Sequence, residues 1–416
     1  MFRPSHRAPA ALLCGVLLAG AAAPAHAAQP SERPKPCSNE VQPPHPVDTS
    51  EVPRPGQRAP EPLPVPEEPV GGPRLGGCLQ IVPDSPLRVP RRITAASWLL
   101  ADLDTGAVLA AKDPHARHRP ASLIKVLLAL VVLDELDPDL IVRATKSDAS
   151  QECTCIGIRR GQRYPVHKLF TGLLIRSGND AAHTLGTALG GIDKALAKMN
   201  ALARELRALD TRAATVSGLD GPGMSSSAYD QALILRAAME QPRFAKAVRT
   251  RELRFRWHRR KQPITLYNDN RLLSGPEAYP GFLGGKTGFT DDARHTYLGT
   301  ARRDGKRLAV ILMRAEAEPE RPSAQARRLL DYGFRLAARD TEPVGELVDP
   351  TPVAAGKLEE PGEEPGEEPG EQPGKEPAKP AAAPDDGASS TPWIVGLLVI
   401  GTALAGGFLL RRKPRR

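Results

Sequence analysis

Proline separates this chain into a part that can fold and two flanks that resist folding. The 416 residues contain 43 prolines, which concentrate in residues 28–90 and 341–392. Proline fixes its own φ and lacks the N–H group that helices and sheets use, so both stretches are expected to be extended and mostly disordered, the first of them pinned by Cys37 and Cys78. Residues 91–340 remain as one globular unit, long enough to bury a sizeable core.

The flank at 341–392 repeats Glu-Pro-Gly (EEPGEEPGEEPGEQPG). Proline keeps such a segment open and repulsion between glutamates extends it, so roughly 50 residues could reach on the order of 150 Å. We interpret this flank as a linker that acts as a stalk. We do not expect the Glu-Pro-Gly repeat to bind calcium.

Both ends of the chain have targeting patterns. Basic residues, an apolar run and the A-x-A site Ala25–Ala27 predict a signal peptide over 1–27, with an uncleaved anchor as the alternative. Residues 393–410 carry no charge and precede a basic tail at 411–416. This predicts a single transmembrane helix with a cytoplasmic tail, and a domain outside the cell membrane on the cell-wall side. No LPxTG-like pentapeptide supports the competing wall-sorting signal.

Four cysteines remain once Cys14 is removed with the signal peptide: Cys37, Cys78, Cys153 and Cys155. An even number outside the cytoplasm predicts two disulfides. Cys153 and Cys155 would share a face of an extended segment at the upper edge of bridging distance. A local bridge and links back to the other two cysteines therefore both stay open. Zinc is the remaining alternative, but no histidines lie nearby at ligand spacing, and no metal is expected.

Periodicity predicts a mixed fold for residues 91–340. Alternating segments around the turn DTG at 104–106 predict a β-hairpin, helical periodicity follows, and strand signals return late. The expected helices are 122–136, 166–176, 180–189, 194–209, 228–239 and 324–337, and the expected strands are 96–103, 107–111, 265–267, 284–290, 296–301 and 308–313. This order predicts an α/β (α+β) domain, with an antiparallel sheet flanked by helices and a helical insertion.

Charge and aromatic content exclude one class of partner. The net charge of +9 is scattered, and aromatic residues make up only 4% of the chain. Basic residues interleaved with aromatics, which typify nucleic-acid surfaces, do not occur. We therefore expect no nucleic-acid partner.

Ser122 and Lys125 open the most apolar helix of the chain. A lysine among so much apolar surface costs on the order of several kcal/mol unless it is paired, neutralised or functional. Residues three apart share a helix face, so this lysine could take the serine proton if burial and a neighbouring cation keep it neutral. Taken alone, an N-cap serine with a snorkelling lysine explains the pair equally well.

Two further fragments follow downstream. Ser177-Gly178-Asn179 lies at a loop-to-helix junction, and Lys286-Thr287-Gly288 lies on an expected strand. Each has an ordinary explanation, N-cap chemistry for the first and a strand ending at glycine for the second. Three such fragments in one exported domain are hard to explain in this way together.

The ordered triplet S-x-x-K, S-x-N and K-T-G is the signature of penicillin-binding proteins and β-lactamases. With the flanking segments 101–122, 218–230 and 329–338, the domain resembles the serine D-alanyl-D-alanine carboxypeptidases, the low-molecular-mass penicillin-binding proteins. The resemblance covers most of 92–338 and neither tail. It implies a β-lactamase/transpeptidase-like fold, β-lactam antibiotics as inhibitors, and no cofactor.

The resemblance also implies the reacting groups. Ser122 would attack the carbonyl between the last two D-alanines of a peptidoglycan stem pentapeptide and form an acyl-enzyme. Lys125 would accept the serine proton. Ser177, hydrogen-bonded to both Lys125 and Lys286, would pass a proton to the departing D-alanine.

Further residues are implied as substrate contacts. Asn179 would hold Lys125 and the substrate amide, and Lys286, Thr287 and Gly288 would lie near the terminal carboxylate. The backbone N–H groups of Ser122 and Phe289 would form the oxyanion hole.

Three residues downstream of the third motif each have more than one interpretation or a structural one. Arg321 lies where relatives place an arginine for the substrate carboxylate, a task that suits a guanidinium, although it is also one of many surface arginines. Arg294 departs from the family, which usually has glycine there. Its side chain could crowd the strand or face the substrate. His295 is expected to be structural.

Several related activities remain as alternatives. D,D-endopeptidase activity on cross-links uses the same groups. A class A β-lactamase needs a loop glutamate to activate water, and here Glu205 stands within an expected helix. The non-enzymatic alternative is a sensor that binds penicillin but catalyses no reaction.

Overall fold

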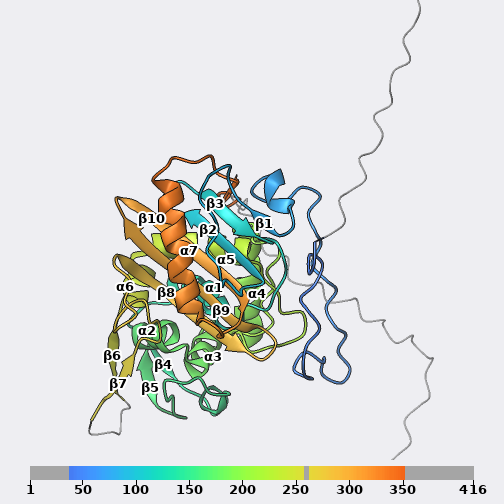
Figure 1. Cartoon of the computed structure of the whole chain (residues 1–416). Helices are drawn as coiled ribbons and strands as arrows, with labels where there is room; N and C mark the ends of the chain where they lie inside the picture. Colours follow the sequence, from blue (N-terminus) through green and yellow to red (C-terminus); the bar gives the residue numbers. More distant parts are fainter. Residues whose placement is uncertain (1–36, 257–261, 352–416) are drawn as a thin grey trace, which may run out of the picture. The chain divides into compact units, whose positions relative to one another are not determined.

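A computed structural model describes residues 37–256 and 262–351 (Figure 1). The expected signal peptide, most of the linker, the transmembrane helix and the basic tail lie outside these residues and stay predictions. In the part of the chain that the structure describes, no helix is long and apolar enough to cross a membrane.

The centre of the domain is an antiparallel sheet with the strand order β1-β3-β2-β10-β9-β8, to which β11 adds by pairing with β3. Its strands are β1 (Gln80–Ile81), β2 (Ser97–Asp102), β3 (Ala107–Lys112), β8 (Phe282–Thr290), β9 (Arg294–Arg303), β10 (Lys306–Ala315) and β11 (Gly345–Glu346). The expected hairpin is β2–β3, and the late strand signals form β8, β9 and β10. The predicted antiparallel sheet is confirmed.

Helices cover both faces of this sheet. The terminal helix α7 (Pro322–Ala337) crosses one face (Figure 1), where Leu100 and Val310 belong to the same apolar cluster as its side chains. The neighbouring residues Leu99 and Ile311 point to the opposite face, into the cluster that contains α1 (Lys125–Glu135) and α5 (Ala228–Glu240). Alternation along the strands thus builds two cores.

The expected helical insertion lies between α1 and α5. It contains α2 (Val166–Arg176), α3 (Asn179–Ala188) and α4 (Ile192–Glu205). The short elements β4 (Ile141–Arg143), β5 (Arg163–Pro165), α6 (Pro242–Val248), β6 (Glu252–Phe255) and β7 (Ile264–Tyr267) complete the fold, together with the 3₁₀ turns η1 (Pro73–Gly76), η2 (Ala121–Ile124) and η3 (Asp148–Ser150). Sequence periodicity predicted the helices of the insertion but missed β4, β5, β6 and α6, because three to seven residues show too little of a period.

Residues 37–78, which we call the strap, are held against the domain, and this corrects the expectation of a mostly disordered flank. A disulfide joins Cys37 to Cys78. The buried side chains of Arg117 and Arg119 donate hydrogen bonds to four strap carbonyls, those of Val41, Pro44, Leu63 and Pro64. Proline removes N–H donors but leaves carbonyl acceptors, so a proline-rich segment has spare oxygens that a buried guanidinium can satisfy.

The domain also continues beyond its expected end at residue 340. Val344 and Leu347 are buried, and β11 pairs with β3 between them. The first residues of the expected linker therefore belong to the fold.

The second disulfide is local, between Cys153 and Cys155. Their Cα atoms are 4.8 Å apart, closer than two such residues in an extended strand, because the chain bends at Thr154. The prediction of two disulfides is confirmed, and the structure selects the local pairing.

Candidate active site

Ser122 and Lys125 lie where a 3₁₀ turn meets a helix. Ser122 belongs to η2, and Lys125 is the first residue of α1, so the single helix expected from residue 122 begins with a tighter turn. The Lys125 Nζ atom lies 2.7 Å from the Ser122 Oγ atom. The predicted contact between the two side chains is confirmed.

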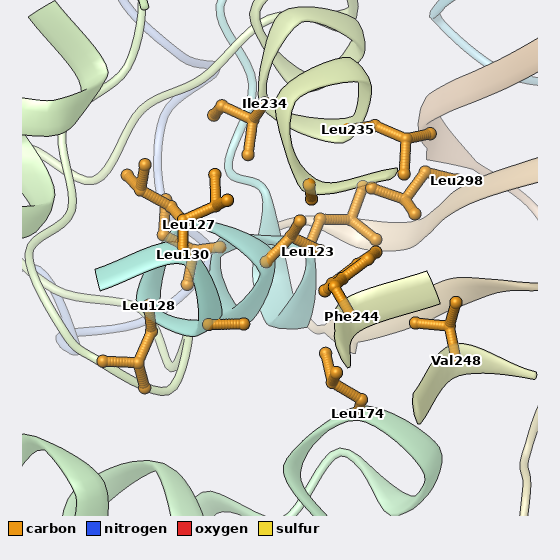
Figure 2. Close-up of a cluster of buried hydrophobic side chains, with 14 of the residues drawn as sticks. Leu123, Leu127, Leu128, Leu130, Leu174, Ile234, Leu235, Phe244, Val248 and Leu298 are labelled. Atoms are coloured by element: carbon orange, nitrogen blue, oxygen red, sulfur yellow. The ribbon is translucent and has the colours of Figure 1, made fainter. Parts of the chain in front are cut away.

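Apolar side chains surround the helix that begins at Lys125. Figure 2 shows Leu123, Leu127, Leu128 and Leu130 packed among residues of four other elements. These are Leu174 of α2, Ile234 and Leu235 of α5, Phe244 and Val248 of α6, and Leu298 of β9. Lys125 itself has no exposed surface. Taking an ammonium group out of water at such a position disfavours its charged form.

Three oxygen atoms surround the Lys125 amine. Besides Ser122 Oγ, they are Asn179 Oδ1 at 2.8 Å and the backbone oxygen of Ser217. The last two are carbonyl oxygens, which only accept. A neutral amine has two N–H donors and one lone pair, so both donors go to the carbonyls and the lone pair faces the serine hydroxyl.

The electrostatics favour this neutral amine. Burial, and next the positive charge of Lys286, hold the pKa of Lys125 well below its usual range, while Asp180 opposes them weakly. Lysine with a depressed pKa is a competent general base for serine. The arrangement can therefore take the Ser122 proton.

Lys286 lies on β8 and is only 2% exposed. Burial lowers the pKa of Lys286 to about 7, against an opposing contribution from Asp269. Its Nζ atom donates to the carbonyl oxygen of Thr287 at 2.6 Å. An incoming anion would favour the charged form of this lysine, so the residue can change its charge when a carboxylate binds.

The S-x-N motif links two helices. Ser177 ends α2 in the left-handed conformation with φ of 56°, and Asn179 begins α3. Asn179 holds Lys125 as expected. The Ser177 hydroxyl, by contrast, makes no hydrogen bond to Lys125 or Lys286 within the described residues, which differs from the expected contacts. Both amines already meet other oxygens.

The K-T-G strand lies against the nucleophile turn. A Cβ atom on Gly288 would stand 2.9 Å from the Ser122 backbone nitrogen and 2.4 Å from Thr296 Oγ1. The glycine therefore allows β8 to approach Ser122, and Phe289 is the residue that follows this glycine in the strand. The hydroxyl of Thr296, on the neighbouring strand β9, donates to the carbonyl oxygen of Pro120 at 2.9 Å and so joins the sheet to the turn that carries Ser122. An oxyanion hole from the N–H groups of Ser122 and Phe289 is compatible with this approach.

Sequence reasoning missed three residues of this arrangement: Ser217, Gly218 and Thr296. Gly218 has φ of +81°, and a Cβ atom there would stand 1.9 Å from the backbone oxygen of Ala121. Gly218, the first glycine of the segment VSGLDG at 216–221, was the only sequence feature that could have indicated this close approach. Nothing in the sequence around Ser217 or Thr296 indicated their contacts.

Arg321 lies in the same pocket as Thr287 and Gly288. Its side chain is 59% exposed and forms a long ion pair of 3.6 Å with Glu277. Arg271 lines the same pocket and pairs with the same carboxylate at 3.0 Å. The pocket therefore offers two guanidinium groups, of which the sequence pointed to one.

Arg294 does not crowd the strand. It has φ of +54°, a left-handed conformation that glycine adopts more readily than other residues. Its guanidinium turns outward to make two hydrogen bonds to Glu316 at 3.1 and 3.0 Å and lies 5.8 Å from the ring centroid of Phe289. His295 contacts the same ring, with centroids 4.7 Å apart. Both side chains thus support Phe289.

Among residues 37–256 and 262–351, two groups of side chains have donor sets that could bind a metal: His115 with Asp210 and Asp230, and Glu51 with Asp220 and Asp292. Their atoms are already used within the protein. Asp210, for example, accepts from both His115 and Arg117, and Glu51 accepts from Arg119. We assign both groups to the packing of the domain.

Comparison with known proteins identifies relatives of this chain. A family model described as D-alanyl-D-alanine carboxypeptidase matches residues 84–317. The D-alanyl-D-alanine carboxypeptidase DacB2 of Mycobacterium tuberculosis is 46% identical over 259 residues, which cover 61% of this chain and 84% of the relative. DacD of Escherichia coli, which bears the same enzyme name, is 33% identical over 271 residues, covering 62% of this chain and 67% of its own.

Solved structures agree. A crystal structure of D-alanyl-D-alanine carboxypeptidase from Mycobacterium tuberculosis matches with a TM-score of 0.60 and 43% identity, covering 64% of this chain and 99% of that one. The S96A mutant of the Streptomyces K15 DD-transpeptidase matches with a TM-score of 0.56 and 25% identity, covering 59% and 100%. The sheet, its helices and the insertion are thus a known peptidase fold.

Proposed function

The chain belongs to the D-alanyl-D-alanine carboxypeptidase family of serine peptidases, and on this premise we propose that it removes the terminal D-alanine of peptidoglycan stem peptides through an acyl-enzyme on Ser122. One observation carries the proposal. The amine of a fully buried lysine lies 2.7 Å from the hydroxyl oxygen of that serine. A serine is a weak nucleophile until such a base accepts its proton.

Acylation follows from the positions of these groups. The Ser122 hydroxyl gives its proton to Lys125 as its oxygen attacks the carbonyl carbon between the two D-alanines. The N–H groups of Ser122 and Phe289 stabilise the negative charge on the carbonyl oxygen. The bond to the leaving nitrogen then breaks, and the proton held by Lys125 passes to this nitrogen. Ser177 is the proposed relay, which requires its hydroxyl to turn toward the amine that it does not contact in the described structure. Lys125, neutral again, takes a proton from water as the water oxygen attacks the acyl group, and it returns this proton to the departing Ser122 oxygen.

Cations recognise the substrate end. Lys286, with Thr287 beside it, would meet the carboxylate of the terminal D-alanine. Arg321 and Arg271 line the adjacent pocket and can supply a bidentate contact. A β-lactam carries a comparable carboxylate and a reactive amide, so penicillins are expected to acylate Ser122.

A comparison of wild type with Ser122→Ala tests the function. Wild type should bind a fluorescent penicillin covalently and release D-alanine from a stem pentapeptide, and the variant should do neither. Full turnover by Ser122→Ala would refute the assignment. Penicillin labelling without D-alanine release would favour an idle sensor.

Cross-linked muropeptides and the fate of the bound penicillin distinguish the carboxypeptidase from a D,D-endopeptidase and a β-lactamase. Cleavage of cross-linked muropeptides that matches or exceeds D-alanine release would identify a D,D-endopeptidase. Rapid hydrolysis of the penicillin, without a lasting adduct, would identify a β-lactamase.

We also propose that residues 1–27 direct export and that residues 393–410 anchor the domain, through the linker 341–392, on the cell-wall side of the membrane. The uncharged segment and its basic tail at 411–416 support this. Removal of residues 393–416 should move the protein from the membrane fraction to the medium. Retention in the membrane would refute the anchor.

A further inference from the structure

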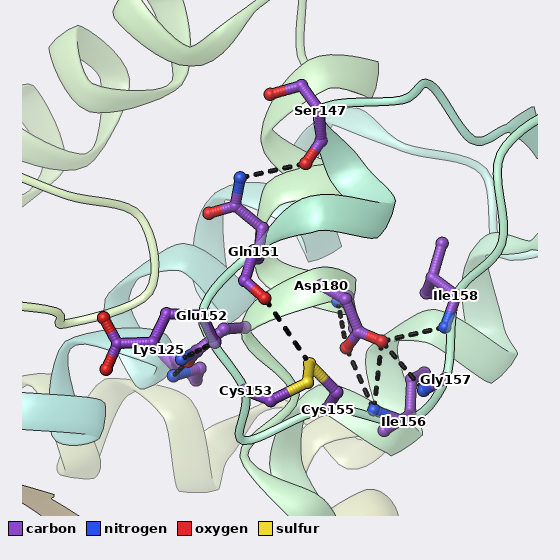
Figure 3. Close-up of a disulfide and its surroundings, with 12 residues drawn as sticks. Lys125, Ser147, Gln151, Glu152, Cys153, Cys155, Ile156, Gly157, Ile158 and Asp180 are labelled. Carbon is purple, nitrogen blue, oxygen red and sulfur yellow. Dashed lines mark hydrogen bonds between the residues drawn. A yellow bond between two sulfur atoms is a disulfide. The ribbon is translucent and has the colours of Figure 1, made fainter. Parts of the chain in front are cut away.

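Residues 151–158, which we call the Cys loop, are not used in the proposed reaction. The loop has no helix or strand, and the bond between Cys153 and Cys155 closes it at its centre. Cys153 is exposed to solvent. The loop nevertheless lies at the start of α3, beside Lys125 (Figure 3).

The backbone on both sides of the disulfide holds the first two residues of α3. The carbonyl of Thr154, between the two cysteines, accepts from the Asn179 backbone N–H at 2.7 Å, and the carbonyl of Glu152 accepts from Asn179 Nδ2 at 2.8 Å. After the disulfide, three consecutive N–H groups at 156–158 donate to the Asp180 carboxylate at 2.8–3.1 Å (Figure 3). The loop thus contacts the motif asparagine and its neighbour from two directions.

The contact with Glu152 determines which way the Asn179 amide points. A carbonyl oxygen only accepts, so it must face the NH₂ end of the amide. The oxygen end, Oδ1, is then directed at Lys125 Nζ, 2.8 Å away. With Ser217 as the second acceptor, this leaves the lone pair of the neutral amine for Ser122. The position of the Glu152 carbonyl therefore affects the orientation of the base.

The disulfide adds little to global stability. Its cysteines are two positions apart, whereas Cys37 and Cys78 are separated by 41. The chain entropy that a cross-link removes from the unfolded state grows with the length of the closed loop. A bridge this short mainly restrains the local path of the backbone, which here carries the carbonyls of Glu152 and Thr154.

We propose that the Cys153–Cys155 disulfide is a positioning device that holds Asn179, and through it Lys125, in the geometry needed for acylation of Ser122. The inference rests on the proposed function of Ser122 and Lys125. Breaking the bond leaves both cysteines in place and frees the backbone between Glu152 and Ile156 to move. A displacement of about 1 Å near reacting groups can lower a rate on the order of a hundredfold.

The test uses the Cys37→Ala/Cys78→Ala variant, in which the Cys153–Cys155 bond is the only disulfide expected among the described residues. Dithiothreitol, a dithiol, supplies two electrons and two protons to the disulfide, which yields two thiols, and is itself oxidised to a cyclic disulfide. Alkylation followed by mass analysis verifies the two new thiols. The rate of acylation by fluorescent penicillin is measured as a function of pH for the oxidised, the reduced and the reoxidised protein.

Reduction should slow acylation about 10- to 100-fold and move the acid limb of the pH profile upward, because water that reaches a loosened site favours the charged form of Lys125. Reoxidation should restore both. Addition of Cys153→Ala/Cys155→Ala to the same Cys37→Ala/Cys78→Ala background should give a protein that is slow from the start and insensitive to the dithiol, with a melting temperature near that of the background.

Unchanged acylation and an unmoved acid limb after verified reduction would overturn the positioning role. A slower rate with an unmoved acid limb and a large fall in melting temperature would overturn it too, because the bond would then be structural. Failure of the proposed function has a different signature, since wild type would not be acylated at Ser122 in any redox state.

Discussion

Two cations are buried in the active site and two are buried beneath the strap, but only the pair beneath the strap has carboxylate partners. Lys125 and Lys286 in the site are 0% and 2% exposed, and Arg117 and Arg119 beneath the strap are 1% and 2% exposed. Removal of any of these charges from water is unfavourable. The difference lies in what each charge meets inside the protein.

The two arginines meet carboxylates. Arg117 Nε lies 3.0 Å from Asp210 Oδ1, and Arg119 makes two hydrogen bonds to Glu51 at 2.5 and 2.7 Å. Strap carbonyls accept four further hydrogen bonds from the two guanidinium groups. Such pairing keeps a guanidinium charged and holds the strap on the domain.

The two lysines meet neutral oxygens instead. In the part of the chain that the structure describes, neither forms an ion pair with a carboxylate, and burial lowers the pKa of both. A cation buried with an anion stabilises structure, whereas a lysine buried without one becomes a reactive amine. Four substitutions or conditions test this contrast.

The largest effect is expected for Lys125→Met. Loss of the base should lower the rate of penicillin acylation about 10²- to 10⁴-fold. The melting temperature should change little, because methionine keeps most of the volume and removes a buried amine that has no carboxylate partner, while the oxygens of Asn179 and Ser217 lose a donor. Stopped-flow labelling and thermal unfolding measure the two quantities. A variant that is both active and less stable would contradict the role given to Lys125.

The reverse pattern is expected for Arg117→Met. The free energy of unfolding should fall by about 3–5 kcal/mol, since Asp210 and the strap carbonyls lose their buried partner. Acylation by the folded protein should be unchanged. Denaturant titration measures the loss, and the Arg117→Met/Asp210→Asn variant should recover part of it. An unaffected stability would show that the strap does not depend on this arginine.

A pH dependence is expected from Lys286. Its pKa of about 7 means that its charge is lost as the pH rises through neutrality, so the KM for a carboxylate-terminated substrate should increase above pH 7. The same substrate with a terminal amide serves as the control and should show no such increase. Folding stability should move the other way and rise above pH 7, because the unfolded lysine binds its proton more tightly there. A KM that does not change between pH 6 and 9 would contradict this prediction.

The smallest effect is expected for Arg294, an exposed cation whose backbone has positive φ. Arg294→Gly should lose the ion pair to Glu316 but relieve the left-handed strain, with little net change in stability. Arg294→Ala loses the pair and keeps the strain, so it should be less stable than the glycine variant by about 1 kcal/mol. Thermal unfolding compares the two, and equal stability would show that the conformation is unstrained.

Much of the site could be predicted from the chain because its motifs are local. Ser122 and Lys125 are one helical turn apart, so their contact follows from spacing alone. The later motifs were recognised from residue types in a fixed order, and the structure brings Asn179 and Gly288 to the same place. The Ser177 contacts, expected from resemblance rather than from spacing, were not found.

The strap shows where composition misleads. Its prolines predicted disorder because a proline-rich segment cannot bury enough apolar surface or form backbone ladders of its own. The prediction failed because the missing donors come from Arg117 and Arg119, about 50 to 75 residues away. The composition of a segment indicates which hydrogen bonds and apolar contacts the segment can form internally. It does not indicate which donors a distant segment will provide after folding.

The sequence by itself determined the longer helices and strands of the domain, the cysteine count and the order of the three motifs, because each depends on neighbouring residues. The tertiary structure decided the cysteine pairing, the strap and the state of the two lysines. Ser217 is 92 residues from the Lys125 amine that it contacts, and the burial that lowers the pKa comes from helices of separate segments. Charge state depends on the surroundings in space, and these exist only after folding has brought distant segments together.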